Sequence, residues 1–198
     1  MPAKIDRWPG NDRREARVID QLRESAAKNQ YFVLDYSVAT TGNVAGTSTV
    51  IYETKVPAGL LSRNGDSLQW RLAIAYAATA SIDKVVSIYF GPRGYYAAAF
   101  VPPSTPATLL FSTGALAPNN QNLVLSSVLV RYGINTSKFD LQINSSYTFL
   151  QGLSTYGTNA NNTQNELYLT VIGSGTNAND VSGFMWHVAY LPTSTPNG

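Results

Sequence analysis

Apolar and polar residues alternate along most of the chain from Tyr31 onward. Residues 67–75 show this most clearly, because every second position carries a large apolar side chain: Leu68, Trp70, Leu72 and Ile74. The opposite positions carry Ser67, Gln69, Arg71 and Ala73. Successive side chains of a β-strand point to opposite faces, so this period of two predicts a strand with one buried face and one wet face.

Nine candidate strands follow from this alternation and from the β-branched and aromatic residues within it. They cover residues 31–37, 48–56, 67–76, 84–90, 107–112, 123–132, 138–145, 166–172 and 183–191. Clusters of glycine, proline and asparagine separate them. No stretch of helical period lies between the strands. We therefore expect an all-β domain made of two packed antiparallel sheets, an antiparallel jelly-roll sandwich, and not a parallel α/β sheet.

Two of the strands indicate which side chains face the core. Residues 84–90 allow two inward sets, and the more apolar one is Val86, Ile88 and Phe90. The other set is Val85, Ser87 and Tyr89. In residues 166–172 the inward set is Leu167, Leu169 and Val171. Such one-sided patterns are typical of sheets that pack on one face only.

Two connecting segments have the composition of turns or loops. Asn64-Gly65 is typical of a hairpin turn with positive φ, and we expect Asp66 to bond back to the turn backbone. The stretch 152–164 is rich in asparagine, threonine and glycine. It predicts a long surface loop, either an interaction surface or a mobile connection.

The first 30 residues follow a different pattern. Asp12 as N-cap and Glu15 three residues later form a capping box, which predicts a helix over residues 13–27. Its apolar stripe consists of Val18, Ile19, Leu22 and Ala26. So narrow a stripe cannot stabilise an isolated helix of about 15 residues in water, so the helix needs a partner surface. That surface is either its own β-domain or another subunit, with Trp8 as an anchor in both cases.

Charge divides the chain at the same place. Residues 1–30 carry 12 of the 26 charged residues of the protein, although only 13% of all its residues are charged. We therefore expect a helical arm over residues 1–30, a β-domain over residues 31–192 and a C-terminal tail over residues 193–198.

Composition narrows the class of protein further. The 198 residues suit one domain with a short appendage, and the absence of cysteine excludes disulfides and thiolate metal sites. A net charge of +2 gives no electrostatic reason to expect nucleic-acid binding. We expect no membrane insertion, because no run of about 18 apolar residues occurs. The charged N-terminus does not resemble a secretion signal, so we expect synthesis in a cytoplasm.

Candidate chemistry is sparse. His187 is the single histidine, in the last predicted strand, and we expect it at an edge or on a wet face. One histidine without cysteine cannot build a typical zinc site, and no serine-nucleophile motif is present. Glycoside hydrolysis needs two facing carboxylates, and nothing marks a pair among Asp35, Glu53, Asp140 and Glu166. We expect no enzyme activity, no metal and no cofactor.

Tyrosines offer the best candidates for contact residues. The chain has 12 of them, and a tyrosine suits interfaces because one end is apolar and the other wet. Tyr95 and Tyr96 follow a Gly-Pro-Arg-Gly loop, and Tyr156 lies in the asparagine-rich stretch. We predict these three at an interface or stacked on a glycan, and half-buried strand positions are the alternative that explains most of the tyrosines.

Several motifs of the β-domain share one known pattern. Residues 56–72 hold Val-Pro-Ala-Gly-Leu, then Asn-Gly-Asp and an alternating strand; residues 84–91 hold a Lys-led strand that ends in Phe-Gly. Together with residues 167–175 and 186–192, they resemble phage virion-surface single jelly-roll proteins. The resemblance covers about residues 45–192. It departs from the pattern at Gly59, where asparagine is common, and in the arm, which the pattern lacks.

This resemblance implies a virion structural protein that forms a homotrimer. One expected function is decoration or cement of the capsid, in which Trp8, Val18, Ile19 and Leu22 dock the arm onto the major capsid protein or another virion subunit. The alternative is a short tail or head fibre that binds a host-surface glycan through Tyr95, Tyr96 or Tyr156. Fold alone does not decide between the two.

Overall fold

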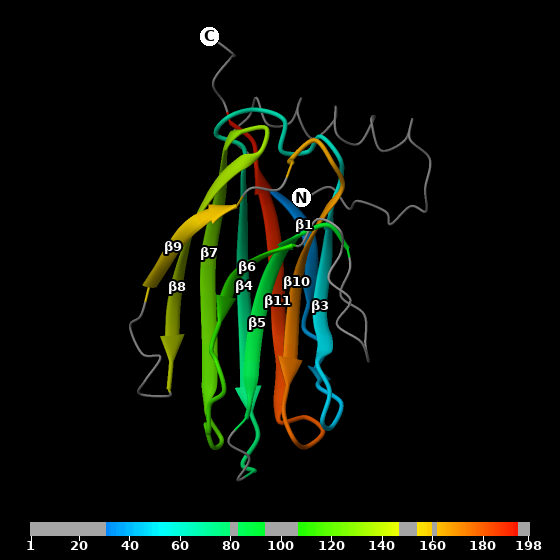
Figure 1. The fold of residues 1–198 in the computed structure, drawn as a ribbon, viewed down its shortest axis with the longest axis vertical. Coiled ribbons are helices and arrows are strands. Elements are labelled where there is room, and N and C mark those ends of the chain that lie inside the picture. The colour runs from blue at the N-terminus through cyan, green and yellow to red at the C-terminus, as the bar shows by residue number, and fades with distance from the viewer. Residues whose placement is uncertain (1–30, 80–82, 94–106, 147–153, 160–161, 194–198) are drawn as a thin grey trace.

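The computed structural model describes residues 31–79, 83–93, 107–146, 154–159 and 162–193 (Figure 1). This part of the chain is all-β and contains no helix. Its strands are β1 (Phe32–Ser37), β2 (Thr41–Gly42), β3 (Thr49–Val56), β4 (Ser67–Tyr76), β5 (Val85–Gly91), β6 (Thr108–Ser112), β7 (Asn122–Gly133), β8 (Thr136–Ser145), β9 (Ser154–Asn159), β10 (Leu167–Ser174) and β11 (Val181–Leu191). The helical arm predicted for residues 1–30 lies outside the described residues. The residues that the structure describes form no helix that could span a membrane.

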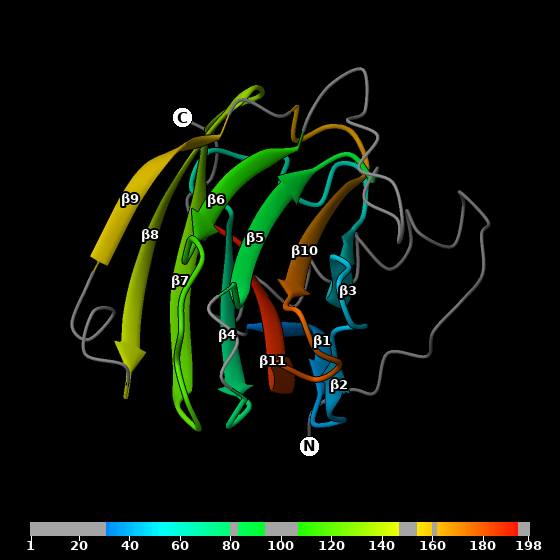
Figure 2. The ribbon, with the colours of Figure 1, turned by 60° about the horizontal axis from the view of Figure 1, so that its bottom comes forward.

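The strands form two antiparallel sheets that lie face to face (Figures 1 and 2). The larger sheet has the order β1-β11-β4-β7-β8-β9, with β2 also paired to β11. The smaller sheet has the order β3-β10-β5-β6. Neighbours in each sheet are mostly distant in sequence, so each face is assembled from widely separated segments.

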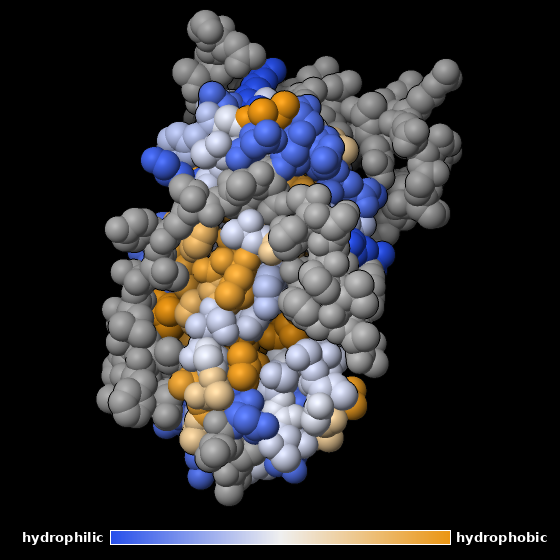
Figure 3. All heavy atoms as spheres, in the orientation of Figure 1, coloured by the Kyte–Doolittle hydropathy of each residue, from blue (hydrophilic) through white to orange (hydrophobic). Residues whose placement is uncertain are grey.

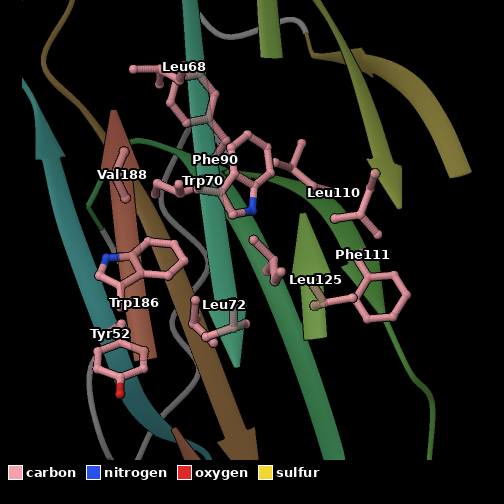
Figure 4. Packing of buried hydrophobic residues seen from close by; sticks show 14 of the residues in the cluster. Tyr52, Leu68, Trp70, Leu72, Phe90, Leu110, Phe111, Leu125, Trp186 and Val188 are labelled. Atoms are coloured by element: carbon pink, nitrogen blue, oxygen red, sulfur yellow. The ribbon is translucent and has the colours of Figure 1, made fainter. Parts of the chain in front are cut away.

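The hydrophobic core lies between the sheets, and the predicted inward faces are confirmed. Leu68 and Leu72 are fully buried, and Trp70 is almost so (Figure 4). Ile74 is also fully buried. The structure decides between the two inward-facing sets that residues 84–90 allow: Val86, Ile88 and Phe90 all belong to this core. The inward set of β10 is also confirmed: Leu167, Leu169 and Val171. One continuous core therefore joins the inner faces of both sheets.

Two strands lie where the pattern of apolar residues does not predict them. The stretch 152–164, expected to be a loop, contains β9, which pairs with β8 from Ser137–Asn159 to Gln142–Ser154. Its sequence, Ser-Thr-Tyr-Gly-Thr-Asn, has no apolar alternation, because an edge strand can be held by backbone bonds to one neighbour. The two-residue strand β2 is too short to leave a pattern.

The Asn-Gly-Asp turn connects the two sheets and does not form the hairpin that we predicted. It lies between β3 of the smaller sheet and β4 of the larger one. Gly65 has φ +93, as the motif requires. Asp66 is buried, and its carboxylate accepts hydrogen bonds from the Arg63 amide at 2.8 Å and the Thr193 amide at 3.0 Å. The expected bond to the turn is thus confirmed, and the same side chain also fixes the segment that follows β11.

Replacing Asp66 with asparagine is expected to lower the free energy of unfolding by about 1–3 kcal/mol. Both carboxylate oxygens accept a backbone N–H, whereas an asparagine side chain has a single acceptor oxygen and would leave one buried amide unpaired. Urea unfolding measures the change. Asp140→Asn is the matched control, because Asp140 is exposed and its side chain makes no hydrogen bond in the described chain. Equal stability of the two variants would contradict this role of Asp66.

Candidate binding groove

The outer face of the larger sheet is hollowed into a groove of about 420 Å³. It crosses four neighbouring strands, β11, β4, β7 and β8. Tyr31, the residue directly before β1 in the chain, also borders it. The outward side chains that line it are Tyr31, Gln69, Arg71, Ser126, Val128, Asp140, Gln142, His187 and Ala189. Two inward residues, Trp70 and Ser127, also border the groove. Its volume lies within the range of about 300–1,000 Å³ that is usual for ligand sites.

Strand register places these side chains in two rows across the sheet. In the first row, Arg71 of β4 stands opposite both His187 of β11 and Ser126 of β7, and Ser126 stands opposite Gln142 of β8. Because directly opposed residues have Cβ atoms about 4.5–5.5 Å apart, neighbouring side chains of this row lie close enough to bind one ligand together.

The second row lies beside the first and is less polar in its middle. Gln69 stands opposite Ala189 and Val128, and Val128 stands opposite Asp140. In this row the apolar Val128 separates the amide of Gln69 from the carboxylate of Asp140, and Ala189 ends the row on β11.

An aromatic margin follows the groove on the side of β1. Tyr31 and Tyr36 are 66% and 59% exposed. The ring of Tyr36 meets that of His187 edge to face, with 6.4 Å between the ring centroids. Exposed rings beside a polar groove present flat apolar faces to a ligand that carries both hydroxyl and C–H groups.

Four polar side chains of the groove are uncommitted, whereas the Ser127 hydroxyl donates to the Asp140 carbonyl at 2.6 Å. Within the described chain, the side chains of Gln69, Arg71, Asp140 and Gln142 make no hydrogen bond and no ion pair. Polar side chains inside the protein behave differently: Asn43 donates to the carbonyl oxygens of three residues and accepts from the Val181 amide at 2.8 Å. The groove thus gathers free amide, carboxylate and guanidinium groups that can bind a polyhydroxylated ligand.

The geometry does not assemble a hydrolytic site from the candidates that the sequence offered. His187 lies on the wet face, as one alternative predicted, but not at an edge, because β11 is flanked by β1 and β4. Asp140 lines the groove, whereas Asp35 accepts a hydrogen bond from Thr54 at 2.8 Å. The described residues also contain no group of three metal-ligating side chains.

The other two carboxylates lie on the outer face of the smaller sheet, where cations neutralise them. Glu166 pairs with Lys55 at 2.7 Å, and Glu53 pairs with Arg93 at 2.9 Å. The Tyr168 hydroxyl donates to Glu166 at 2.5 Å, and the Arg93 guanidinium lies 5.2 Å from the Tyr168 ring centroid. The hydrogen bonds from Lys55 and Tyr168 lower the pKa of Glu166, while burial and then Glu166 raise the pKa of Tyr168.

This second face is therefore occupied by its own ion pairs. Figure 3 views the molecule from this side and shows apolar side chains gathered near its middle. Leu109 of β6 is 48% exposed. Because the charged groups of this face already have partners, the groove on the opposite sheet is the better candidate for a polar ligand.

Seven residues were predicted from the sequence as docking or contact residues, and most of them lie outside the part of the chain that the structure describes. Six of them lie outside the described residues: Trp8, Val18, Ile19, Leu22, Tyr95 and Tyr96. The seventh, Tyr156, belongs to β9 and pairs through its backbone with Asp140, but its side chain is also outside the described part. Sequence reasoning missed the groove itself. The available signal was the polar face of residues 67–75, which includes Gln69 and Arg71.

No protein-family model and no curated protein matches the chain. Among solved structures, it is similar to the marine PL-14 alginate lyase from Aplysia kurodai, with a TM-score of 0.43 and 10% identity over 78% of this chain and 82% of that one. It is also similar to peanut lectin with a 9mer peptide, with a TM-score of 0.42 and 8% identity over 81% and 90%. A legume lectin-like domain from Entamoeba histolytica gives 0.30 and 12% over 86% and 93%. All these TM-scores lie below 0.5, so the likenesses carry no weight for function.

Proposed function

We propose that the chain is a jelly-roll module of the virion surface whose groove binds a saccharide of the host cell without cleaving it. The observation that carries this proposal is the set of uncommitted polar side chains across the groove, above all Gln69, Arg71, Asp140 and Gln142. Ring hydroxyls of a sugar both donate and accept, and these side chains offer both functions side by side.

Chain order supports the jelly-roll part of the proposal. The chain passes from one sheet to the other six times, between β2 and β3, β3 and β4, β4 and β5, β6 and β7, β9 and β10, and β10 and β11. Repeated crossing between two antiparallel sheets is the arrangement expected of such sandwiches. The place on a virion rests on the resemblance of residues 45–192 to phage virion-surface proteins.

Binding without hydrolysis is supported by the separation of the acidic residues. Within the described chain, Asp140 is the one carboxylate that lines the groove, and Glu53 and Glu166 belong to the smaller sheet. Hydrolysis of a glycosidic bond needs two carboxyl groups on opposite sides of the same bond.

Closing the groove with a bulky residue is expected to abolish saccharide binding. Ser126 lies in the middle of the first row and faces outward, so Ser126→Trp fills the groove without entering the core. We would apply labelled wild-type protein and this variant to an array of bacterial cell-surface saccharides. Wild-type protein should label a subset of saccharides, and the variant should lose at least about 90% of that signal, because occlusion removes nearly all contacts of the site.

Thr136→Trp is the matched control, since it adds the same side chain at an exposed position of β8 that does not line the groove. The control should label the array as wild-type protein does. The proposal is wrong if wild-type protein labels no saccharide, or if the Ser126 and Thr136 variants behave alike. Release of sugar fragments from the bound saccharide would show an enzyme and contradict binding without cleavage.

Capsid decoration and the homotrimer stay predictions. Both depend on the arm or on contacts between copies, and residues 1–30 lie outside the described chain. The groove is the feature that gives the receptor-binding alternative its specific support.

A further inference from the structure

Arg71 stands in the groove without an acidic neighbour. On its own strand, the residues two positions away on the same face are Gln69 and Ala73. Across the neighbouring strands it faces His187 and Ser126. None of these four positions carries a carboxylate, so the positive charge of Arg71 is not balanced by its direct neighbours.

Most other cations of the described chain have partners. Two form ion pairs, Lys55 with Glu166 and Arg93 with Glu53. The remaining partners are neutral: three carbonyl oxygens for Lys84, the Gly133 carbonyl for Arg131 and the Tyr132 ring for Lys138. Arg63 is unpaired like Arg71, but it lies in the turn before β4, outside the groove.

The acidic residue of the groove lies on another strand. Asp140 belongs to β8, and β7 separates β8 from the β4 strand of Arg71. Asp140 is also in the second row, opposite Val128, whereas Arg71 is in the first. The groove therefore has a cationic position and an anionic position that do not neutralise each other.

We propose that the groove binds an anionic saccharide whose acidic substituent, a carboxylate or a sulfate ester, contacts the Arg71 guanidinium. This inference rests on the proposed function. Planar guanidinium binds such oxyanions through two parallel N–H bonds, and charge-assisted bonds are stronger than neutral ones. Gln142 and Asp140, farther along the sheet, would then bind hydroxyl groups of the same ligand.

The test compares matched ligands on matched variants of the full chain. The probes are hexasaccharides of galacturonate, mannuronate and hyaluronan with their carboxyl-reduced forms, and dextran sulfate oligosaccharides of similar length with the unsulfated dextran. The variants are Arg71→Gln and Arg63→Gln, which remove the same charge inside and outside the groove. Isothermal titration calorimetry gives the dissociation constants.

Wild-type protein is expected to bind at least one acidic probe about tenfold or more tightly than its neutral counterpart. Arg71→Gln should lose that preference, and Arg63→Gln should keep it. Preference for a uronate identifies the carboxylate as the ligand group, and preference for dextran sulfate identifies the sulfate ester.

Two results would overturn the inference while the proposed function stands: equal binding of acidic and reduced probes that Ser126→Trp abolishes, or an acid preference that Arg71→Gln retains. A preference lost equally in both arginine variants would show attraction to the net positive charge alone and would overturn it as well. Failure of every acidic probe to bind would overturn the inference, and the saccharide array would then decide separately whether the proposed function stands.

Discussion

Replacing Lys84 with methionine is expected to lower the free energy of unfolding by about 3–5 kcal/mol. The side chain of Lys84 is completely buried. Its ammonium group donates to the carbonyl oxygens of Ala77 at 2.8 Å, Thr79 at 2.9 Å and Pro118 at 2.6 Å. Methionine matches the lysine in length but donates no hydrogen bond, so all three carbonyl oxygens would lose this donor.

The size of this loss of stability depends on how many carbonyl oxygens keep another hydrogen-bond donor. The Ala77 carbonyl also accepts from the Asn120 amide at 3.4 Å, so it keeps one bond. The Thr79 carbonyl would lose a donor, and the Pro118 carbonyl would depend on water for a replacement; an unpaired buried acceptor costs about 1–3 kcal/mol. The lysine also joins the segment after β4 to the segment before β7, so its loss should loosen that end of the sandwich.

Urea unfolding of Lys84→Met measures this loss, with Lys138→Met as the matched control. Lys138 is exposed on β8 and lies 4.8 Å from the Tyr132 ring centroid. Its replacement should change stability by no more than about 1 kcal/mol, because an exposed cation–π contact is weak. Similar losses for the two variants would contradict the structural role of Lys84.

A second large effect is expected for Trp186, whose replacement by alanine should cost about 3–5 kcal/mol. Trp186 is 1% exposed, and its ring stacks on Tyr52 with 5.8 Å between centroids (Figure 4). Its Nε1 donates to Thr54 Oγ1 at 2.7 Å, and Thr54 donates to Asp35 at 2.8 Å. Alanine would leave a cavity and would also remove the donor of this chain of bonds.

An intermediate variant separates the two contributions. Trp186→Phe keeps much of the aromatic packing against Tyr52 and removes the Nε1 donor, so its cost should fall clearly below that of alanine. His187→Ala serves as the control on the same strand, because His187 faces the groove and not the core. Thermal and urea unfolding measure the loss of stability. We expect it to be largest for Trp186→Ala, smaller for Trp186→Phe and smallest for His187→Ala. A Trp186→Ala loss no larger than that of the control would refute this packing.

Residue patterns predict the core of this protein well. The period of two in β4 identifies Leu68, Trp70, Leu72 and Ile74 because a strand can turn only one face to the core. The same rule identifies the inward residues of β5 and β10. It fails for β9, where an edge strand is held by backbone pairing and side-chain hydropathy carries no signal.

The groove could be predicted only in part. The wet face of β4 identifies Gln69 and Arg71 as outward, but hydropathy does not say which strands flank it. The partners come from remote parts of the chain, with His187 on one side and Ser126 on the other. The Asn-Gly-Asp turn shows the same limit, because its local signature is right while its connection between two sheets depends on the whole fold.

Backbone amide NMR during titration with the saccharide that binds best tests most directly whether the outer face of the larger sheet is the binding site. We predict that shift changes concentrate on the four strands of the groove, around Gln69, Arg71, Ser126, Asp140 and His187. They should be absent from the outer face of the smaller sheet, around Tyr168. Changes confined to that smaller sheet, or no localised changes at saturating ligand, would contradict a binding site in the groove.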